Sequence, residues 1–166
     1  IGEAVRNYVV DFGVSTAVGP TREIHSEIIA TDPIVLVCHR DASLAKKRSL
    51  KWAEICQQRL MGYKASSAIR QSIDGALAKA GMELLWFDEV ETLSSLVSYL
   101  RTGQFVGVVP RLVASQLGEL AVVPLAAPRI ERKIYLLRRN DVEMNAPARA
   151  FWNDARARLG SALQRR

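Results

Sequence analysis

The sequence predicts an α/β protein, in which short buried strands alternate with amphipathic helices along 166 residues. One observation is the near-continuous apolar run at residues 34–38, which is typical of a strand covered on both faces of a sheet. A second is the recurrence of apolar side chains at helical spacing, as at Ile69, Ile73, Leu77 and Ala80. Because strands and helices alternate, we expect the strands to pair mostly in parallel.

The segment before the apolar run predicts a helix, a strand and a loop. Residues 1–8 carry apolar side chains at helical spacing, and residues 9–14 have the composition of a buried strand. Ser15 and Thr16 form a polar turn directly after that strand. A glycine and a proline then indicate a loop over residues 17–23.

Residues 60–81 predict a strand, a serine turn and a helix. The apolar residues 60–63 form the strand, and either Ser66 or Ser67 can cap the helix by accepting a free amide of its first turn. Gly81 stands where a left-handed residue ends such a helix. The turn would direct backbone N–H groups and a hydroxyl at one spot, which suits a small anion or carboxylate. On these residues alone, an ordinary capped helix is the favoured interpretation.

The rest of the chain continues the alternation. The expected loop and strands are a polar loop at 39–47 and strands at 84–87, 105–109 (before Pro110), 120–123 and 134–137. Short helices are expected at 50–56 and 112–117. Two longer helices are expected, one with the buried side chains Leu93, Leu96, Val97 and Leu100, and a final one from about Pro147 with the buried side chains Phe151, Trp152, Ala155 and Leu159. Composition shifts near 57–60 and 125–131 indicate crossings between two lobes.

The composition excludes several classes of protein. The hydrophobic fraction of 49% and the charged fraction of 24% are those of a soluble globular protein. No apolar run reaches the roughly 20 residues of a membrane span. Cys38 and Cys56 read as reduced, buried residues of a cytosolic protein, and with His25 and His39 they form no metal-ligand spacing.

No motif for catalysis or for a cofactor occurs in the sequence. The glycine-rich strings that bind dinucleotides or nucleotide phosphates are absent, and so is the Gly-x-Ser-x-Gly elbow of a serine hydrolase. The acidic residues Asp88, Glu89 and Glu91 are explained by the favourable field at a helix start. We therefore expect no enzyme activity and no cofactor.

The net charge of +6 is unevenly distributed. Residues 1–100 carry 11 basic and 12 acidic side chains, whereas residues 101–166 carry 12 basic and 5 acidic ones. The basic residues of this last third are dispersed and lack the interleaved aromatics of a single-strand-binding surface. We expect a solvated face there, with a direct nucleic-acid-binding module as the alternative.

Six segments, at 10–14, 32–37, 43–45, 66–81, 96–110 and 147–159, follow one another in an order that resembles the regulatory domain of LysR-type transcriptional regulators. Together they span nearly the whole chain. The resemblance implies a two-lobed fold like that of type II periplasmic binding proteins. It implies a discontinuous lobe I at 1–58 and 131–166, and a lobe II at 59–130.

The resemblance also implies a ligand cleft between the lobes. The contacts carried over by position are Ser66, Ser67, Ala68 and Ile69 in lobe II, Ser15 and Thr16 in lobe I, and Val109 and Pro110 near the wall of the cleft. We expect a small anionic metabolite to bind there, to change the geometry of the domain and so to control DNA binding and transcription.

The family implies partners as well. Relatives pair as homodimers, with tetramers in the full-length protein, and bind operator DNA through a winged helix-turn-helix that this sequence does not contain. The first strand-helix-strand unit of the regulatory domain is also expected to be missing here. We expect a cytoplasmic protein without a membrane partner. A solute-binding protein of a transporter is the alternative within the same fold.

Overall fold

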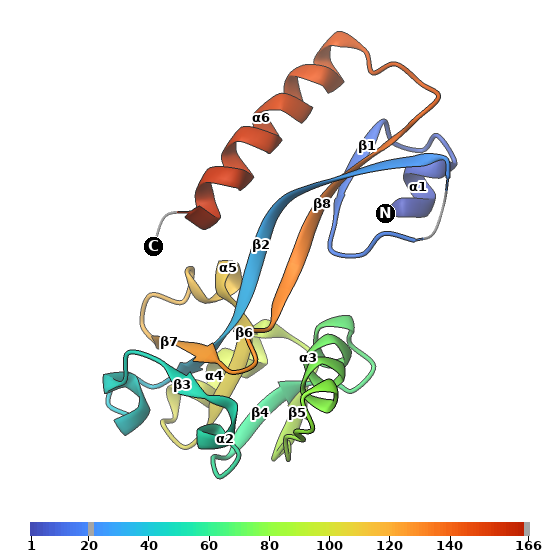
Figure 1. Ribbon diagram of the computed structural model, residues 1–166. Helices are drawn as coiled ribbons and strands as arrows, with labels where there is room; N and C mark the ends of the chain where they lie inside the picture. The colour runs from blue at the N-terminus through green and yellow to red at the C-terminus, as the bar shows by residue number, and fades with distance from the viewer. Residues whose placement is uncertain (20–21, 165–166) are drawn as a thin grey trace. The chain divides into compact units, whose positions relative to one another are not determined.

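The computed structural model describes residues 1–19 and 22–164, with side chains up to residue 158 (Figure 1). The side chain of Leu159, expected on the buried side of the last helix, lies outside this description. The chain forms two compact units: unit 1 comprises Ile1–Asp32 and Arg132–Arg166, and unit 2 comprises Pro33–Glu131.

The described part of unit 1 combines two helices with three strands. Its elements are α1 (Gly2–Arg6), β1 (Phe12–Ser15), the first part of β2 (Ile24–Cys38), β8 (Glu131–Arg139) and α6 (Ala146–Gln164). The strand β8 lies between β1 and β2 and pairs with β1 in antiparallel fashion. The helix α6 begins as expected near Pro147, and Asn145 caps it by accepting a hydrogen bond from the Ala148 amide at 2.9 Å.

The strand expected at residues 9–14 begins only at Phe12. Val9 and Val10 are 72% and 43% exposed, and the amides of both donate to the Ala4 carbonyl oxygen. The chain therefore folds back on the end of α1, helped by the positive φ of 59° at Tyr8. Two β-branched residues have the composition of a strand, but here they form part of this turn.

Unit 2 holds the remaining elements. In chain order they are the end of β2, the 3-10 helix η1 (Ser43–Lys46), β3 (Leu50–Lys51), α2 (Trp52–Ile55), β4 (Leu60–Tyr63), α3 (Ala68–Lys79), β5 (Asp88–Val90), α4 (Leu93–Arg101), β6 (Val106–Pro110), α5 (Arg111–Ala114) and β7 (Ala121–Ala126). The strand order is β7-β2-β6-β4-β5, and β3 pairs with β7. No helix in the described part of the chain is long and apolar enough to cross a membrane.

The sheet is mixed, which corrects the expectation of mostly parallel pairing. The strand β2 is antiparallel to both β6 and β7, with Val35 opposite Val109 and Pro124, whereas β4 is parallel to β5 and β6. Residues 34–38 are fully buried as predicted. A continuous apolar run indicates that a strand is buried on both faces, but it does not indicate whether its neighbours run parallel or antiparallel to it. This explains the difference.

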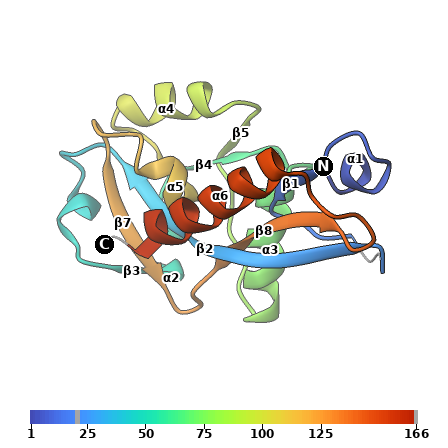
Figure 2. The same ribbon diagram turned by 90° about the horizontal axis from the view of Figure 1, so that it is seen from above.

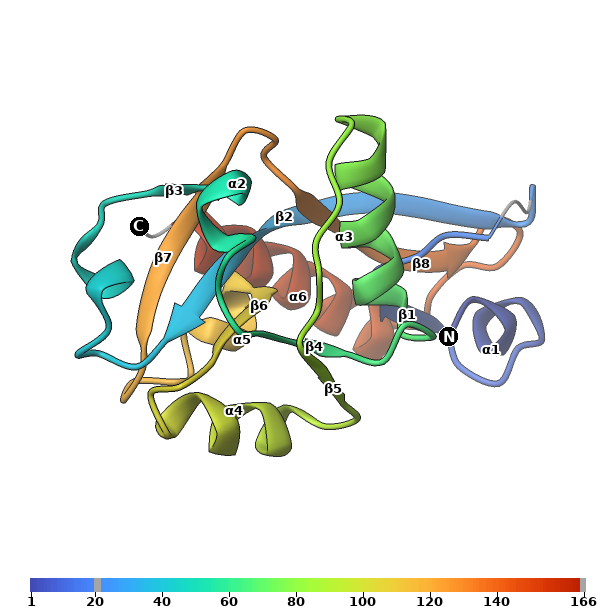
Figure 3. The same cartoon turned by 90° about the horizontal axis from the view of Figure 1, so that it is seen from below.

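Two apolar clusters cover the two faces of this sheet. Along β2, Leu36 faces a cluster that contains Trp52 of α2 and Leu77 of α3, whereas Val35 faces one that contains Leu96 of α4. Figures 2 and 3 show α2 and α3 on one side of these strands and α4 on the other. Because α2 packs in this core, the structure places residues 33–58 in unit 2, whereas the sequence-based division placed them in lobe I.

The boundaries of α3 and α4 agree with their local signals. Ser67 and Thr92 are the N-caps, and Gly81 and Gly103 follow the helices with φ of +70° and +73°. The strand expected at 84–87 is different: that stretch is irregular, and β5 begins at Asp88.

The irregular stretch is explained by packing. Leu84 is buried against the α3 side of the sheet, and Leu85 is 77% exposed. The Phe87 amide donates to the Leu60 carbonyl oxygen at 2.8 Å just before regular pairing with β4 starts. The apolar run therefore covers the core before the chain joins the sheet.

Candidate functional site

The candidate residues of unit 2 gather at the turn of residues 64–67, between β4 and α3. The Ser67 hydroxyl oxygen accepts the amide of Arg70 at 3.2 Å, and the Ser67 amide donates to the Lys64 carbonyl oxygen at 2.8 Å. Ser66 is exposed, and its hydroxyl has no partner in the described part of the chain. The amides of Ala68 and Ile69, at the first positions of the helix, likewise have no acceptor among the described residues.

This geometry can hold a small acceptor group. One free hydroxyl and two free amides lie at consecutive or neighbouring positions of the exposed helix start, and the helix dipole favours negative charge there. Ser67 is the cap, and its oxygen accepts the Arg70 amide, while its O–H can still donate. Ser66 is the serine whose hydroxyl has no partner among the described residues.

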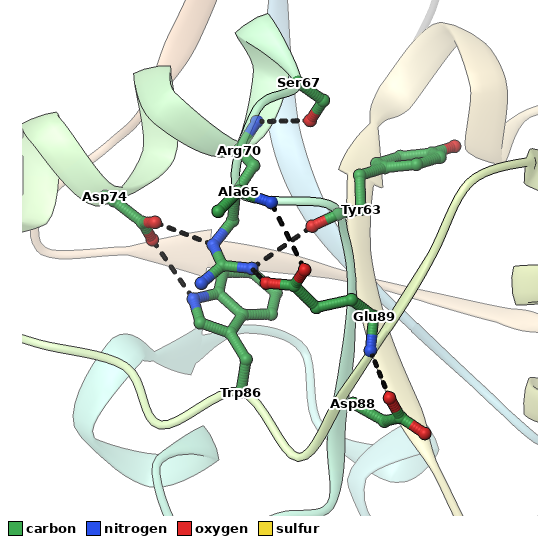
Figure 4. A network of polar contacts seen from close by, with 8 residues as sticks. All are labelled: Tyr63, Ala65, Ser67, Arg70, Asp74, Trp86, Asp88 and Glu89. Carbon is green, nitrogen blue, oxygen red and sulfur yellow. Dashed lines mark hydrogen bonds and ion pairs between the residues drawn. The ribbon is translucent and has the colours of Figure 1, made fainter.

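Arg70 ties the turn to three other parts of unit 2 (Figure 4). Its Nε donates to Asp74 Oδ2 at 2.6 Å, and its Nη1 donates to the Tyr63 carbonyl oxygen at 3.1 Å and to Glu89 Oε1 at 2.9 Å. The guanidinium lies 4.1 Å from the centre of the Trp86 ring. Only 10% of the Arg70 side chain is exposed, whereas Asp74 and Glu89 are 42% and 39% exposed, so both ion pairs reach solvent on their acidic side.

Trp86 packs between the Arg70 guanidinium and Gly62 of β4. Its indole N–H donates to Asp74 Oδ1 at 3.1 Å, and its ring packs on Gly62 of β4. A Cβ at position 62 would lie 2.3 Å from Trp86 Cε3, so only glycine allows this approach. The residues Arg70, Asp74 and Trp86 also line a hollow of about 460 Å³ beside α3, together with Leu77, Ala78, Gly81, Met82, Glu83 and Leu84.

Asp88, Glu89 and Glu91 precede α4 as expected, and two of them, Glu89 and Glu91, also contact the turn. Glu89 lies on β5, and its second carboxylate oxygen accepts the Ala65 amide at 3.4 Å. Glu91 forms an ion pair with Lys64, and this hydrogen bond lowers the pKa of Glu91 and raises that of Lys64. Each positive side chain of the turn therefore has a carboxylate partner.

Val109 and Pro110 end β6 and are both buried in unit 2. Val109 belongs to the cluster that contains Leu96, and Pro110 stands at the start of α5. Their described surroundings are those of core residues.

Ser15 and Thr16 belong to unit 1. The Ser15 hydroxyl donates to the Ala17 carbonyl oxygen at 2.7 Å and accepts the Ala17 amide at 3.2 Å. Ser15 also lines a hollow of about 490 Å³ within unit 1, next to Arg6 and Leu137. Thr16 is exposed, and its hydroxyl has no partner among the described residues.

Sequence reasoning missed Arg70, Asp74 and Trp86. Arg70 and Asp74 stand four residues apart on a helix, a spacing at which opposite charges pair, so this signal was visible. Glu89 lies 19 residues from Arg70, and the sequence contains no signal for that contact.

The basic residues of the last third are largely engaged in ion pairs. Arg132 pairs with the buried Asp32 at 2.8 Å. The other described pairs join Arg101 to Glu119, Arg129 to Glu131, Arg139 to Asp141, Arg156 to Glu27 and Arg158 to Asp154. These carboxylates neutralise much of the charge that a nucleic-acid surface would need. Among the described residues, no group of three or more His, Cys, Asp or Glu side chains could hold a metal ion.

The sequence model of the family described as LysR substrate binding domain matches residues 1–160. The chain belongs to this family. YfeR of Shigella flexneri, named an uncharacterized HTH-type transcriptional regulator, is 30% identical over 162 residues, which are 97% of this chain and 52% of YfeR. YbhD of Escherichia coli K12, named in the same way, is 30% identical over 144 residues, or 86% of this chain and 45% of YbhD. The chain thus spans about half the length of these relatives.

Solved structures of LysR effector-binding domains have the same fold. The BenM effector binding domain with its effector benzoate matches with a TM-score of 0.81 and 17% identity, over 96% of this chain and 74% of that one. The QuiR effector binding domain in complex with shikimate matches with a TM-score of 0.74 and 20% identity, over 96% and 76%. The predicted family and the periplasmic-binding-protein-like fold are confirmed.

Proposed function

We propose that this chain is the effector-sensing domain of a LysR-type transcriptional regulator, and that it binds a small organic molecule to control DNA binding and transcription. The observation that carries the proposal is the match of the family's substrate binding domain to residues 1–160. The names of the curated relatives support regulation of transcription, and no observation favours a transporter's solute-binding protein.

The turn before α3 is the proposed anchor of the ligand. The Ser66 hydroxyl and the amides of Ala68 and Ile69 would donate hydrogen bonds to a carboxylate or another acceptor group. Each such hydrogen bond contributes about 1 kcal/mol, so selectivity needs several convergent groups. Ser15 and Thr16 would contact the ligand from unit 1, and Ile69 would line the apolar part of the pocket. Val109 and Pro110 would lie close to its wall, behind the residues that touch the ligand.

The remaining parts of the proposal concern partners. The domain would form a homodimer, within a tetramer of the whole regulator, in the cytoplasm. Operator DNA would be bound by a winged helix-turn-helix outside this sequence, and the domain itself would have no catalytic activity. A neighbour of the same fold, full-length CbnR, is described in complex with its target DNA, which is consistent with this division of labour.

Thermal unfolding in the presence of candidate effectors tests the proposal. A panel of organic acids and amino acids that includes benzoate and shikimate would be added to the full-length regulator. One compound is expected to raise the midpoint in a saturable manner, because a ligand that binds only the folded state stabilises it. That compound should also change operator binding by the full-length regulator. Stabilisation without any effect on operator binding would contradict a sensing role.

A further inference from the structure

We propose that Arg70 and Glu89 position the turn of residues 64–67, a role that rests on the function proposed above because this turn is the proposed anchor of the ligand. Arg70 belongs to α3, yet its guanidinium donates hydrogen bonds to the Tyr63 carbonyl oxygen of β4 and to the Glu89 carboxylate of β5. Glu89 in turn accepts the Ala65 amide. The two side chains thus join the strand before the turn, the turn itself and the helix after it.

Residues 64–66 are exposed, and the other contacts of the turn lie at its two ends. At the start, the Lys64 amide donates to the Val90 carbonyl oxygen at 3.2 Å, and the Lys64 side chain pairs with Glu91. At the end, the Ser67 amide donates to the Lys64 carbonyl oxygen at 2.8 Å. The bond from Arg70 to the Tyr63 carbonyl oxygen fixes the entry of the turn, and the bond from Ala65 to Glu89 fixes its middle. These contacts therefore hold the backbone on the N-terminal side of Ser66, from which its side chain projects.

The geometry requires an arginine and not merely a positive charge. The planar guanidinium uses Nε for Asp74 and Nη1 for Tyr63 and Glu89, and its face lies on the Trp86 ring. A lysine ammonium has no such fixed fork and cannot stack in the same way. We therefore expect Arg70→Lys to keep the charge and lose the positioning.

The effect should be local. The Glu89 and Asp74 side chains are 39% and 42% exposed, and ion pairs that reach solvent contribute little to the stability of the whole fold. Replacing a residue that positions a turn should raise the exchange rates of the amides in that turn alone. Replacing a residue that only stabilises the fold should raise the exchange rates of all slowly exchanging amides together.

Amide hydrogen exchange, followed residue by residue by NMR on the full chain, separates these roles. In Glu89→Gln and in Arg70→Lys, the amides of Ala65, Ser67 and Arg70 should exchange about tenfold faster than in the wild type. The amide of Leu36, in the centre of the sheet, should exchange at the wild-type rate. Arg101→Lys is the matched control, because Arg101 forms an exposed pair with Glu119 in the same unit.

Two outcomes would overturn the proposal. One is wild-type exchange at the turn in both variants, and the other is an equal acceleration at Leu36 or in the Arg101→Lys control. The measurement needs no ligand. If no compound of the panel stabilised the regulator, the proposed function would fail, and the exchange rates would still report whether Arg70 and Glu89 hold the turn.

Discussion

The carboxylate of Asp32 is fully buried in unit 1, where its Oδ2 accepts a hydrogen bond from Arg132 Nε at 2.9 Å and forms an ion pair with Arg132 Nη2 at 2.8 Å. Asp32 lies on β2, and Arg132 lies on the neighbouring strand β8, 100 residues later in the chain. The Arg132 side chain is 26% exposed, so one partner reaches water and the other does not. The pair therefore ties together two strands from distant parts of the sequence.

Replacing Asp32 should destabilise unit 1 strongly. In Asp32→Ala the guanidinium loses its buried partner, and breaking a buried pair from one side costs about 3 kcal/mol. Urea unfolding should show this as a lower midpoint with an unchanged slope. Asp154→Asn, which removes an exposed pair with Arg158, is the control and should leave the midpoint unchanged. Equal effects of the two variants would contradict this account.

The two serines of the turn should behave differently. Ser67→Ala removes the cap of α3 and should lower the free energy of unfolding by about 1 kcal/mol. Ser66→Ala removes an exposed hydroxyl without a described partner, so the stability should not change, whereas the affinity for the effector should fall. Denaturant unfolding of both variants and titration with the stabilising compound measure the difference. A Ser66→Ala variant with wild-type affinity would show that the ligand binds elsewhere.

The pH dependence of the pair between Arg139 and Asp141 follows from its geometry. The hydrogen bond from the Arg139 guanidinium holds the pKa of Asp141 at about 2, below the ordinary value of 3.8. Because the folded pKa is the lower one, the stabilisation is present above pH 3.8 and is lost as the pH falls toward 2. An NMR titration of the Asp141 carboxyl group should therefore give a midpoint near 2, and Arg139→Gln should move it upward. An unchanged midpoint in Arg139→Gln would assign the shift to another cause.

Local signals in the sequence predicted much of unit 2, because they act within a few residues. Ser67 and Gly81 mark the ends of α3, and the apolar spacing from Leu93 to Leu100 marks the buried face of α4. The candidate turn was predicted in the same way, since it depends on one cap and one strand. The pocket that it would form with unit 1 stays a prediction.

Features that depend on distant residues were not predictable. The direction of β2 is decided by its pairing with β6 and β7, which follow it by about 70 to 90 residues along the chain. The start of β5 depends on how Leu84 packs against α3, and the spacing of apolar residues in the sequence does not indicate this packing. The partner of Arg70 across the turn is set by the parallel pairing of β4 with β5, because that pairing brings Glu89 opposite Gly62.

Gly62 and Gly75 give a final test of the packing beneath the turn, because the same substitution should have opposite effects at the two positions. In Gly62→Ala the new Cβ would meet the Trp86 ring at 2.3 Å, so the indole must move away from Asp74 and from the Arg70 guanidinium. Overpacking of this kind costs about 1–3 kcal/mol.

Gly75 lies in the interior of α3 with no atom within 4 Å of a new Cβ, so Gly75→Ala should stabilise the helix by about 1 kcal/mol. Urea unfolding of both variants measures the two signs. NMR chemical shifts of the Trp86 indole N–H should change in Gly62→Ala and stay unchanged in Gly75→Ala. A Gly62→Ala variant with wild-type stability and an unshifted indole would show that the Trp86 ring does not pack on β4, and the support of Arg70 from below would then be absent.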